Sequence, residues 1–483
     1  MRFPRWLATS AMFGILAAAC GKSPLLKFTL DAGGIVATPD ALSAPDGPST
    51  PGFCPTGESQ CGSGAFATCR DLRADPANCG SCGHACTPGI PCRNGACQQV
   101  ACRRPVTFTP RDPFAPEPTD TSNSPGWILV DTDADGVLDL VSWSYQHYTP
   151  GDPGPFTGSF NIARGTGQGG FGPATALETA CWVWNITPVD LNGDGVPDLL
   201  IEPAVFPGAD TCPALEAFVG RSGGYPEKGQ PLYVPSPRIP LDTGDWVSGP
   251  GRFLGMGDLN GDGRPDLVTR FLGVGAYKIG ISLANPTGGF DPPRDYETDE
   301  GVNRVDIRDW NGDGSPDLAF VGETIVSLAM LFNRGDGTFD PVKGCGLAQN
   351  FPTPFAIADI TQDGRPDLVH FDGSALSVLG GQGGCAFQVL ASLDVPMGSR
   401  GLTVADLSGD GRLDMVSNVP YGGLDFMYGN PKGSFDLDAY VFPPSFLVGQ
   451  VAIGDLNRDG KPDILVDKGS GWLQVLENTC SPE

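Results

Sequence analysis

The chain has 483 residues, of which 69 are glycine and 47 are proline. So many helix-breaking residues exclude a long helical bundle or a coiled coil, while 40% hydrophobic residues are enough to build a folded core. The net charge of −26 excludes nucleic acids and anionic membrane surfaces as partners and favours cations, and fifteen cysteines suggest an oxidising compartment.

The first segment is typical of an export signal. Arg2 and Arg5 precede an apolar stretch at 6–19 that is too short to span a bilayer. It ends in Leu-Ala-Ala-Ala-Cys20, which resembles the lipobox of bacterial lipoproteins, with Ala17 where leucine is usual. The resemblance implies a signal peptide at 1–19, lipidation of Cys20 and export to a bacterial membrane, for which we expect the outer membrane. The alternative is an ordinary cleaved signal whose Cys20 pairs with another cysteine.

Two segments follow that differ sharply in composition. Residues 20–53 are rich in Pro, Ala, Gly, Asp and Ser, which predicts a flexible, lipid-anchored tether. Nine cysteines then occupy 54–102, a segment too short to build a hydrophobic core without staples. Its run at 75–86 (DPANCGSCGHAC) resembles cysteine-rich modules of exported bacterial surface proteins. We expect a disulfide module, with zinc held by Cys79, Cys82 and the nearby histidine as the alternative.

One nine-residue pattern, with Asp at positions 1, 5 and 9 and Gly at position 6, occurs seven times in the remaining chain. Successive copies begin 47 to 68 residues apart, a spacing typical of a repeat architecture. The copies are Asp131–Asp139 (DTDADGVLD), Asp190–Asp198 (DLNGDGVPD), Asp258–Asp266 (DLNGDGRPD), Asp309–Asp317 (DWNGDGSPD), Asp359–Asp367 (DITQDGRPD), Asp406–Asp414 (DLSGDGRLD) and Asp455–Asp463 (DLNRDGKPD).

Each nonamer offers a set of oxygen ligands. Carboxylates at positions 1, 5 and 9, an oxygen side chain at position 3 and a backbone carbonyl expected from position 7 suit Ca²⁺, which takes six to eight oxygens. Glycine at position 6 permits the positive φ that folds a loop around an ion. The predicted ligands of up to seven calcium ions are Asp131, Asp133, Asp135, Asp139, Asp190, Asn192, Asp194, Asp198, Asp258, Asn260, Asp262, Asp266, Asp309, Asn311, Asp313, Asp317, Asp359, Thr361, Asp363, Asp367, Asp406, Ser408, Asp410, Asp414, Asp455, Asn457, Asp459 and Asp463.

The residues around the nonamers decide the fold. An EF-hand would need Glu at position 12 and flanking helices, but position 12 holds no carboxylate in any copy. The flanks, such as FAIAD and DILVD, are short, apolar and β-branched, as in strands. Each repeat adds a third apolar segment, a Gly-rich turn and an outer strand. Four-stranded antiparallel units at this spacing predict the blades of a β-propeller.

In these loops and blades the chain resembles the FG-GAP/VCBS repeat family, the calcium-loop propellers of integrin α-subunits and many bacterial surface proteins. The resemblance covers residues 103–483. It implies an all-β fold, a seven-bladed β-propeller with calcium-loop blades, preceded by the small disulfide-rich module. Leu138 and Leu413 replace the common proline at position 8. The hydroxyl residues Thr361 and Ser408 at position 3 make the fifth and sixth loops the candidates for the weakest sites.

Ring closure can also be predicted. The seventh repeat lacks an outer strand of its own, and residues 105–113, before the first loop, are similar to a blade edge. We therefore expect 105–113 to complete the last blade. The expected disulfides are Cys102–Cys480 across the closure, Cys181–Cys212 and Cys345–Cys385.

The sequence favours a non-enzymatic function. We expect a monomeric, calcium-binding cell-surface lipoprotein that meets the membrane only through its lipid and whose propeller binds a protein or glycan partner in adhesion. The insertions at 143–156 and 206–237 are the expected recognition loops. Trp143, Tyr145 and Tyr148 would either stack on sugars or pack inside the blades. The alternative is an exported hydrolase or lyase acting on a polysaccharide or phosphoester, although no acid/base pair or nucleophile motif is visible outside the loops.

Overall fold

Short strands joined by loops make up the chain in the computed structural model. In the N-terminal part it describes six strands only: β1 (Phe28–Asp31), β2 (Gly34–Ala37), β3 (Ser59–Cys61), β4 (Thr68–Arg70), β5 (Cys92–Arg93) and β6 (Ala96–Cys97). Beyond them it describes residues 102, 104–116, 126–133, 135–144, 158–191, 196–203, 214–220, 234–235, 239–240, 252–273, 276–286, 289–299, 301–322, 328–345, 355–371, 375–394, 400–418, 423–438, 449–469 and 471–480. Among the described residues, no helix is long and apolar enough to cross a membrane.

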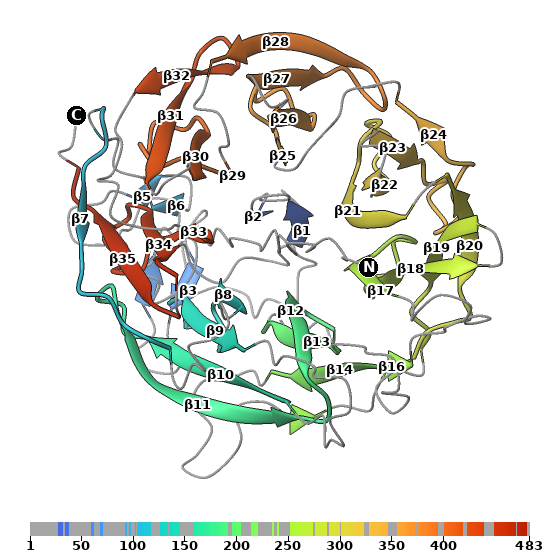
Figure 1. Cartoon of the computed structure of the whole chain (residues 1–483), viewed down its shortest axis with the longest axis horizontal. Helices are drawn as coiled ribbons and strands as arrows, with labels where there is room; N and C mark the ends of the chain where they lie inside the picture. Colours follow the sequence, from blue (N-terminus) through green and yellow to red (C-terminus); the bar gives the residue numbers. More distant parts are fainter. Residues whose placement is uncertain are drawn as a thin grey trace, which may run out of the picture.

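Seven antiparallel sheets stand in a ring as the blades of a β-propeller, which confirms the predicted fold (Figure 1). Blades 1 and 2 comprise β8 (Gly126–Val130), β9 (Asp139–Trp143), β10 (Gly158–Gly165) and β11 (Phe171–Thr179), then β12 (Val183–Val189), β13 (Asp198–Pro203), β14 (Ala214–Val219), β15 (Val234–Pro235) and β16 (Ile239–Pro240). Blades 3 and 4 comprise β17 (Arg252–Gly257), β18 (Asp266–Gly273), β19 (Ala276–Ser282) and β20 (Arg294–Thr298), then β21 (Val302–Arg308), β22 (Asp317–Gly322), β23 (Leu328–Leu331) and β24 (Lys343–Gly344). Blades 5 and 6 comprise β25 (Phe355–Ala358), β26 (Asp367–Phe371), β27 (Leu376–Gly381) and β28 (Phe387–Leu393), then β29 (Arg400–Ala405), β30 (Asp414–Asn418), β31 (Leu424–Asn430) and β32 (Ser434–Asp438).

The seventh blade mixes the two ends of the propeller. It comprises β33 (Val451–Gly454), β34 (Asp463–Asp467), β35 (Leu473–Asn478) and, as its outer strand, β7 (Phe108–Pro110). Phe108 pairs with Asn478 and Pro110 with Leu476, and Figure 1 shows β7 at the rim beside β35. The prediction that the segment before the first loop completes the last blade is therefore confirmed. We call residues 104–116 the closure segment.

Apolar side chains fill the spaces between neighbouring blades. The strands nearest the axis are buried on both faces, so they appear in the sequence as continuous apolar runs. Phe160 of β10 and Phe218 of β14, for example, meet edge to face with ring centroids 5.1 Å apart. The core therefore lies mainly between the blades, and each blade depends on its neighbours for burial.

Two expectations about recognition loops need correction. Trp143 belongs to β9, is 1% exposed, and its indole Nε1 donates to the backbone oxygen of Trp184 in the next blade at 3.3 Å. It packs inside the blades and cannot stack on a sugar. The predicted insertion at 206–237 also contains the third strand of blade 2, because Leu199–Ile201 of β13 pairs with the segment ending at Phe218. Tyr145 and Tyr148 lie outside the described residues.

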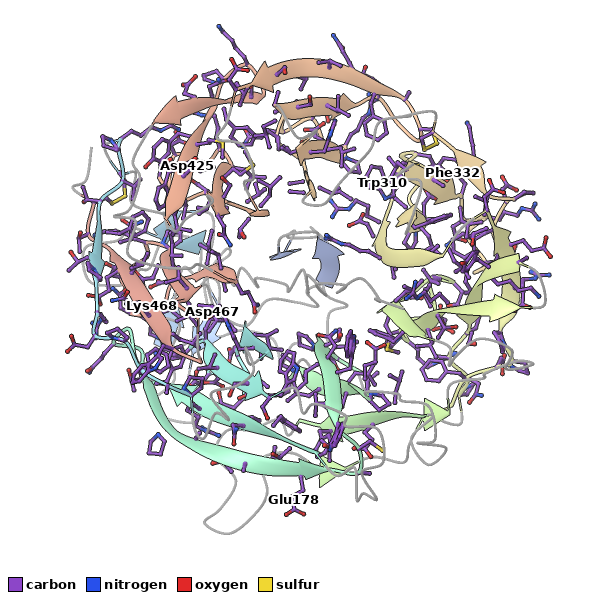
Figure 2. The ribbon with its side chains drawn as sticks, viewed as in Figure 1. Glu178, Trp310, Phe332, Asp425, Asp467 and Lys468 are labelled. Carbon is purple, nitrogen blue, oxygen red and sulfur yellow. A yellow bond between two sulfur atoms is a disulfide. The ribbon has the colours of Figure 1, made fainter. Side chains whose placement is uncertain are left out.

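Disulfides join parts of the ring that are distant in the sequence. Cys102, just before the closure segment, is bonded to Cys480, and Cys345 at the rim of blade 4 is bonded to Cys385 in blade 5. Beside the second disulfide, Trp310 and Phe332 pack between blades 4 and 5 (Figure 2). Cys181 is also disulfide-bonded. Its predicted partner Cys212 lies outside the described residues, as do Cys20 and the predicted signal peptide.

Candidate metal centres

Each nonamer is a hairpin loop between the first two strands of its blade. In all seven blades the residue before position 1 pairs with the aspartate at position 9, as Val130 does with Asp139 and Gly454 with Asp463. The second strand of every blade begins at this aspartate. The repeated register therefore presents the same loop seven times at corresponding places in the ring.

The carboxylate at position 1 holds the loop closed. In six loops it accepts N–H bonds from positions 5 and 6, as Asp258 does from Asp262 at 3.0 Å and from Gly263 at 2.8 Å. The glycine at position 6 has a φ of 79° to 90° in these six loops, which a side chain would strain. Asn192 and Asp194 of the second loop lie outside the described residues.

The aspartate at position 9 ties the loop to the third strand. Its Oδ2 accepts an N–H bond from position 2 or 3, and its Oδ1 accepts one from a residue at the end of the third strand or up to two residues beyond it. For Asp463 the donors are Leu456 at 3.1 Å and Asn478 at 2.8 Å. Six of the seven are fully buried and Asp139 is 2% exposed. Position 9 thus has a structural role that the sequence reasoning, which treated it as a ligand only, did not include.

Burial disfavours the charged form of several loop carboxylates and so raises their pKa values. Burial, together with the carboxylates of Asp135, Asp139 and Asp133, raises the pKa of Asp131 to about 7. Burial, together with the acidic residues of the same loop, likewise raises the pKa of Asp463 to about 7. For four further aspartates at position 9 burial raises the pKa to about 6: Asp139, Asp266, Asp317 and Asp414. A bound cation would offset this cost.

The first loop has the most compact set of acidic ligands. One carboxylate oxygen from each of Asp131, Asp133 and Asp139 lies within 4.8 Å of the other two. An ion about 2.4 Å from each oxygen, the distance that Ca²⁺ adopts, fits between atoms with this separation. The acidic residues of the first loop therefore suit calcium by both geometry and charge.

Position 3 completes the ligand set in the other described loops. The amide oxygens of Asn260, Asn311 and Asn457 face into their loops, where each accepts the N–H of position 5. In the sixth loop Ser408 is fully buried, and its Oγ has no hydrogen-bond partner among the described residues. A buried hydroxyl oxygen without a partner fits a role as a metal ligand.

Cationic side chains reach several loops, and the sequence reasoning missed them. At position 7, Arg264, Arg412 and Lys461 pair with the carboxylate two residues earlier at 2.5, 2.5 and 3.5 Å. Arg164, from the third strand of blade 1, lies 2.5 Å from the carboxylate at position 3 of the first loop. Arg104, from the closure segment, lies 2.5 Å from the carboxylate at position 5 of the sixth.

Two loops carry a side chain where the third, fourth and sixth loops have glycine in a left-handed conformation. Gln362 and Arg458, both at position 4, have φ of 59° and 61° and are the only non-glycine residues with positive φ among those described. Each reaches the next loop around the ring, because Gln362 donates to the backbone oxygen of Gly411 and Arg458 to that of Asp135. These contacts link adjacent loops directly.

A hollow of about 350 Å³ lies at the rim between blades 3 and 4. Its lining contains neither histidine, serine nor cysteine, and consists of Asp295, Tyr296, Glu297, Arg334, Phe339, Pro341 and Val342. His370 lies elsewhere, buried in β26, where it pairs with Phe355 and Ser377. The described residues therefore do not combine a histidine and carboxylates in this hollow.

Comparison with known proteins points to one repeat family. A family model described as FG-GAP-like repeat matches residues 131–201, 258–320, 309–370 and 406–466, which together cover half of the chain. No curated protein matches the chain.

Solved structures show a likeness of fold. One is the structure of an Agrocybe aegerita lectin, solved with regard to its specific recognition of non-reducing terminal N-acetylglucosamine. The two chains are 19% identical, the match covers 66% of this chain and 88% of that chain, and the TM-score is 0.45. Another is the V. cholerae biofilm matrix protein Bap1, with 10% identity, 77% and 91% covered, and a TM-score of 0.41. A third is a protein from Lactobacillus plantarum, with 12% identity, 65% and 82% covered, and a TM-score of 0.41.

Proposed function

The chain belongs to the FG-GAP-like repeat family, and from this premise we propose that it is a calcium-binding cell-surface protein whose propeller serves as a non-enzymatic binding module. Its partner is a protein or a glycan. The observation that carries the proposal is the repeated carboxylate set of the loops, in which the buried aspartate at position 9 recurs in every blade. Burial raises the pKa of Asp131 and Asp463 to about 7 and that of Asp266, Asp317 and Asp414 to about 6.

Calcium fastens the blades in this proposal. Each ion draws together positions 1, 3, 5 and 9 of a loop, and position 9 is already bonded to the third strand of the same blade. At a calcium concentration of ten times Kd, each site stabilises the folded chain by about 1.4 kcal/mol. Several sites together therefore make the propeller dependent on calcium, as expected for a protein outside the cell.

The binding role rests on the loops between strands. Long connections within blades 1 and 2 run from Trp143 to Gly158 and from Val219 to Val234, and we assign partner recognition to them. The rim hollow has carboxylates, a guanidinium and aromatic rings in its lining, and such groups can hold a protein or glycan partner. We further propose that lipid on Cys20 holds the protein at the outer membrane and that 20–53 separates the propeller from it.

Calcium dependence is tested by measuring thermal unfolding and bound metal on the purified mature chain. We expect calcium to remain bound through gel filtration, and EDTA to lower Tm by several degrees. The variant D309N should lose one ion per chain. A chain that carries no calcium and melts at the same temperature in EDTA would contradict the proposal.

Partner binding is tested with a glycan array and a panel of surface proteins, each with calcium and with EDTA. Binding that calcium supports and EDTA abolishes is the expected result. A panel of polysaccharide and phosphoester substrates run beside it should show no turnover, and turnover would favour the enzymatic alternative instead.

A further inference from the structure

A guanidinium group from outside the repeats lies inside the sixth loop. Arg104 Nη2 is 2.5 Å from Oδ2 of Asp410, at position 5, and 3.8 Å from Oδ1 of Asp414, at position 9. It also donates to the backbone oxygen of Gly429, whose own N–H donates to Asp414. The nitrogen therefore lies between two predicted calcium ligands of one loop.

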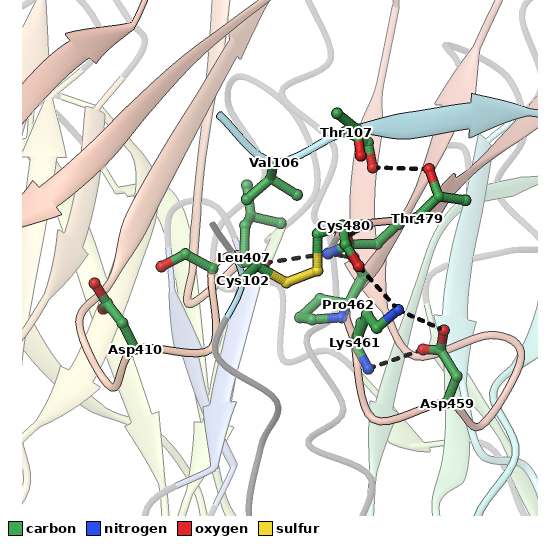
Figure 3. The surroundings of a disulfide bond; sticks show 12 residues. Cys102, Val106, Thr107, Leu407, Asp410, Asp459, Lys461, Pro462, Thr479 and Cys480 are labelled. Carbon is green, nitrogen blue, oxygen red and sulfur yellow. Dashed lines mark hydrogen bonds and ion pairs between the residues drawn. A yellow bond between two sulfur atoms is a disulfide. The ribbon is translucent and has the colours of Figure 1, made fainter. Parts of the chain in front are cut away.

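The surroundings hold this side chain in place. Its guanidinium carbon lies 5.0 Å from the ring centre of Tyr428, and the Tyr428 hydroxyl accepts the N–H of Val106, two residues further along the closure segment. On the other side, Cys102 donates its N–H to the backbone oxygen of Ser408 at 2.6 Å. Figure 3 shows the Cys102–Cys480 disulfide beside Leu407, with Asp410 further along the same loop. Arg104 is 25% exposed and is fixed from both ends.

Distance and charge both disfavour an additional cation here. Ca²⁺ binds carboxylate oxygens at 2.3–2.6 Å, and Arg104 Nη2 already stands at that distance from Oδ2 of Asp410. Arg412 approaches the same oxygen at 2.5 Å, so two guanidinium groups offset two of the three carboxylates in the loop. A divalent ion would meet two positive charges and little negative charge.

Other loops keep more carboxylates that contact no guanidinium group. In the fourth loop, Asp309, Asp313 and Asp317 form no ion pair with a described cationic side chain, so all three charges remain for an ion. In the first loop Arg164 lies 2.5 Å from Asp133, and Arg458 lies 3.8 Å from Asp135. This loop has four acidic ligands, so the carboxylates of Asp131 and Asp139 remain for an ion. Only in the sixth loop, among those described, does a guanidinium lie within 4 Å of two ligand positions.

We infer that Arg104 is the built-in cation of the sixth loop and takes the place of calcium there. This inference rests on the proposed calcium binding by the other loops. The closure segment then has two roles, because it completes the seventh blade and also carries Arg104, which neutralises the sixth loop.

The test counts calcium ions per chain, by elemental analysis after gel filtration, in wild type and variants. R104Q removes one of the two positive charges at the loop and leaves Asp414, the unpartnered Oγ of Ser408 and the second oxygen of Asp410 open to an ion, so we expect it to bind one ion more than wild type. D406N, in an otherwise unchanged chain, should leave the count unchanged. R111Q is the matched control, because Arg111 lies in the same segment but pairs with Glu477 outside any loop.

Thermal unfolding provides a second readout. In EDTA, R104Q should melt below wild type because the loop loses its counter-charge, and calcium should restore more stability to R104Q than to wild type. R104K keeps a positive charge and should keep the wild-type ion count. Equal counts in R104Q and wild type, or a loss of one ion in D406N, would overturn the inference.

Failure of the proposed function gives a different pattern. If neither wild type nor D309N carries calcium, calcium binding itself is refuted and the assignment of Arg104 falls with it. If D309N loses one ion and D406N also loses one, calcium binding stands and the assignment of Arg104 alone is overturned. Should R104Q fail to fold, D406N and R104K still decide the question.

Discussion

Replacing Asp317 by Asn, with Asp313 to Asn as its partner variant in the same loop, separates the structural role of position 9 from the metal role of position 5. Asp317 is fully buried, and it accepts N–H bonds from Asn333 at 2.8 Å, Trp310 at 3.1 Å and Asn311 at 3.2 Å. Asp313 is exposed, and its Oδ1 accepts the N–H of Ser315. Both are predicted calcium ligands.

The magnitudes differ because an amide can accept on one side only. In D317N the NH₂ group faces at least one backbone N–H, which removes a charged hydrogen bond of about 1.5–3 kcal/mol and leaves a buried donor unsatisfied. Burial raises the pKa of Asp317 to about 6, so at pH 8 without a cation its ionised form costs the folded chain about 3 kcal/mol, and D317N removes this cost. We therefore expect D317N to lose about 3 kcal/mol in calcium, where the ion offsets the buried charge, and to change little in EDTA, where the two effects offset each other. D313N should lose less than about 0.5 kcal/mol in EDTA, as other surface substitutions do. In calcium at ten times Kd it should lose about 1.4 kcal/mol more.

Urea unfolding at pH 8, where these carboxylates are largely ionised, measures both variants in calcium and in EDTA. The expected result is a loss for both variants in calcium, larger for D317N than for D313N, and little change for either variant in EDTA. If D317N also loses about 3 kcal/mol in EDTA, the hydrogen bonds to the third strand outweigh the cost of the buried charge. If the two variants lose equally in calcium, the reasoning from burial is wrong.

Three further perturbations test other parts of the ring. Removing the disulfide with C102S/C480S frees a loop of 378 residues and should cost about 4 kcal/mol in urea unfolding, whereas an unchanged midpoint would show that β7 closes the ring unaided. Burial raises the pKa of Asp425 above its unfolded value, so its ionised form opposes folding. D425N should therefore raise Tm at pH 7.5 and leave Tm unchanged at pH 3, where Asp425 is protonated in both the folded and the unfolded chain. A gain in Tm that persists at pH 3 would reject this cause. G126A would place a Cβ 2.2 Å from Cε2 of Trp143 and should cost about 1–3 kcal/mol by calorimetry, while wild-type stability would mean that the indole moves aside.

The repeats made most of the fold predictable. Seven nonamers with strand-like flanks gave the number of blades, because each loop must join two strands and a strand must begin where the apolar flank resumes. The structure starts that strand at position 9 in every blade. The outer strand of the last blade was also predictable, since residues 105–113 look like a blade edge and the seventh repeat lacks one.

Side-chain contacts between distant segments could not be predicted in the same way. Arg104 reaches Asp410 across 306 residues, and no local pattern marks a guanidinium that will enter a loop. Trp143 was offered as an exposed aromatic because it follows a loop, but its position in β9 places it between two blades. The left-handed conformation of Gln362 and Arg458 could have been predicted from the sequence, because both lie at position 4, where three other loops have glycine.

The contacts at the ends of the propeller explain why its closure needs several kinds of bond. Blade 7 holds β7 through a three-residue ladder, which is short for a strand that must keep the ring shut. The disulfide adds a covalent link at Cys480, and Arg458 joins the seventh loop to the first through the backbone oxygen of Asp135 at 2.5 Å. A left-handed non-glycine residue costs about 1–3 kcal/mol, so it persists only where its side chain makes a compensating contact. The last seam of the ring therefore combines main-chain, covalent and loop-to-loop contacts, and Arg104 makes the sixth loop part of the same closure.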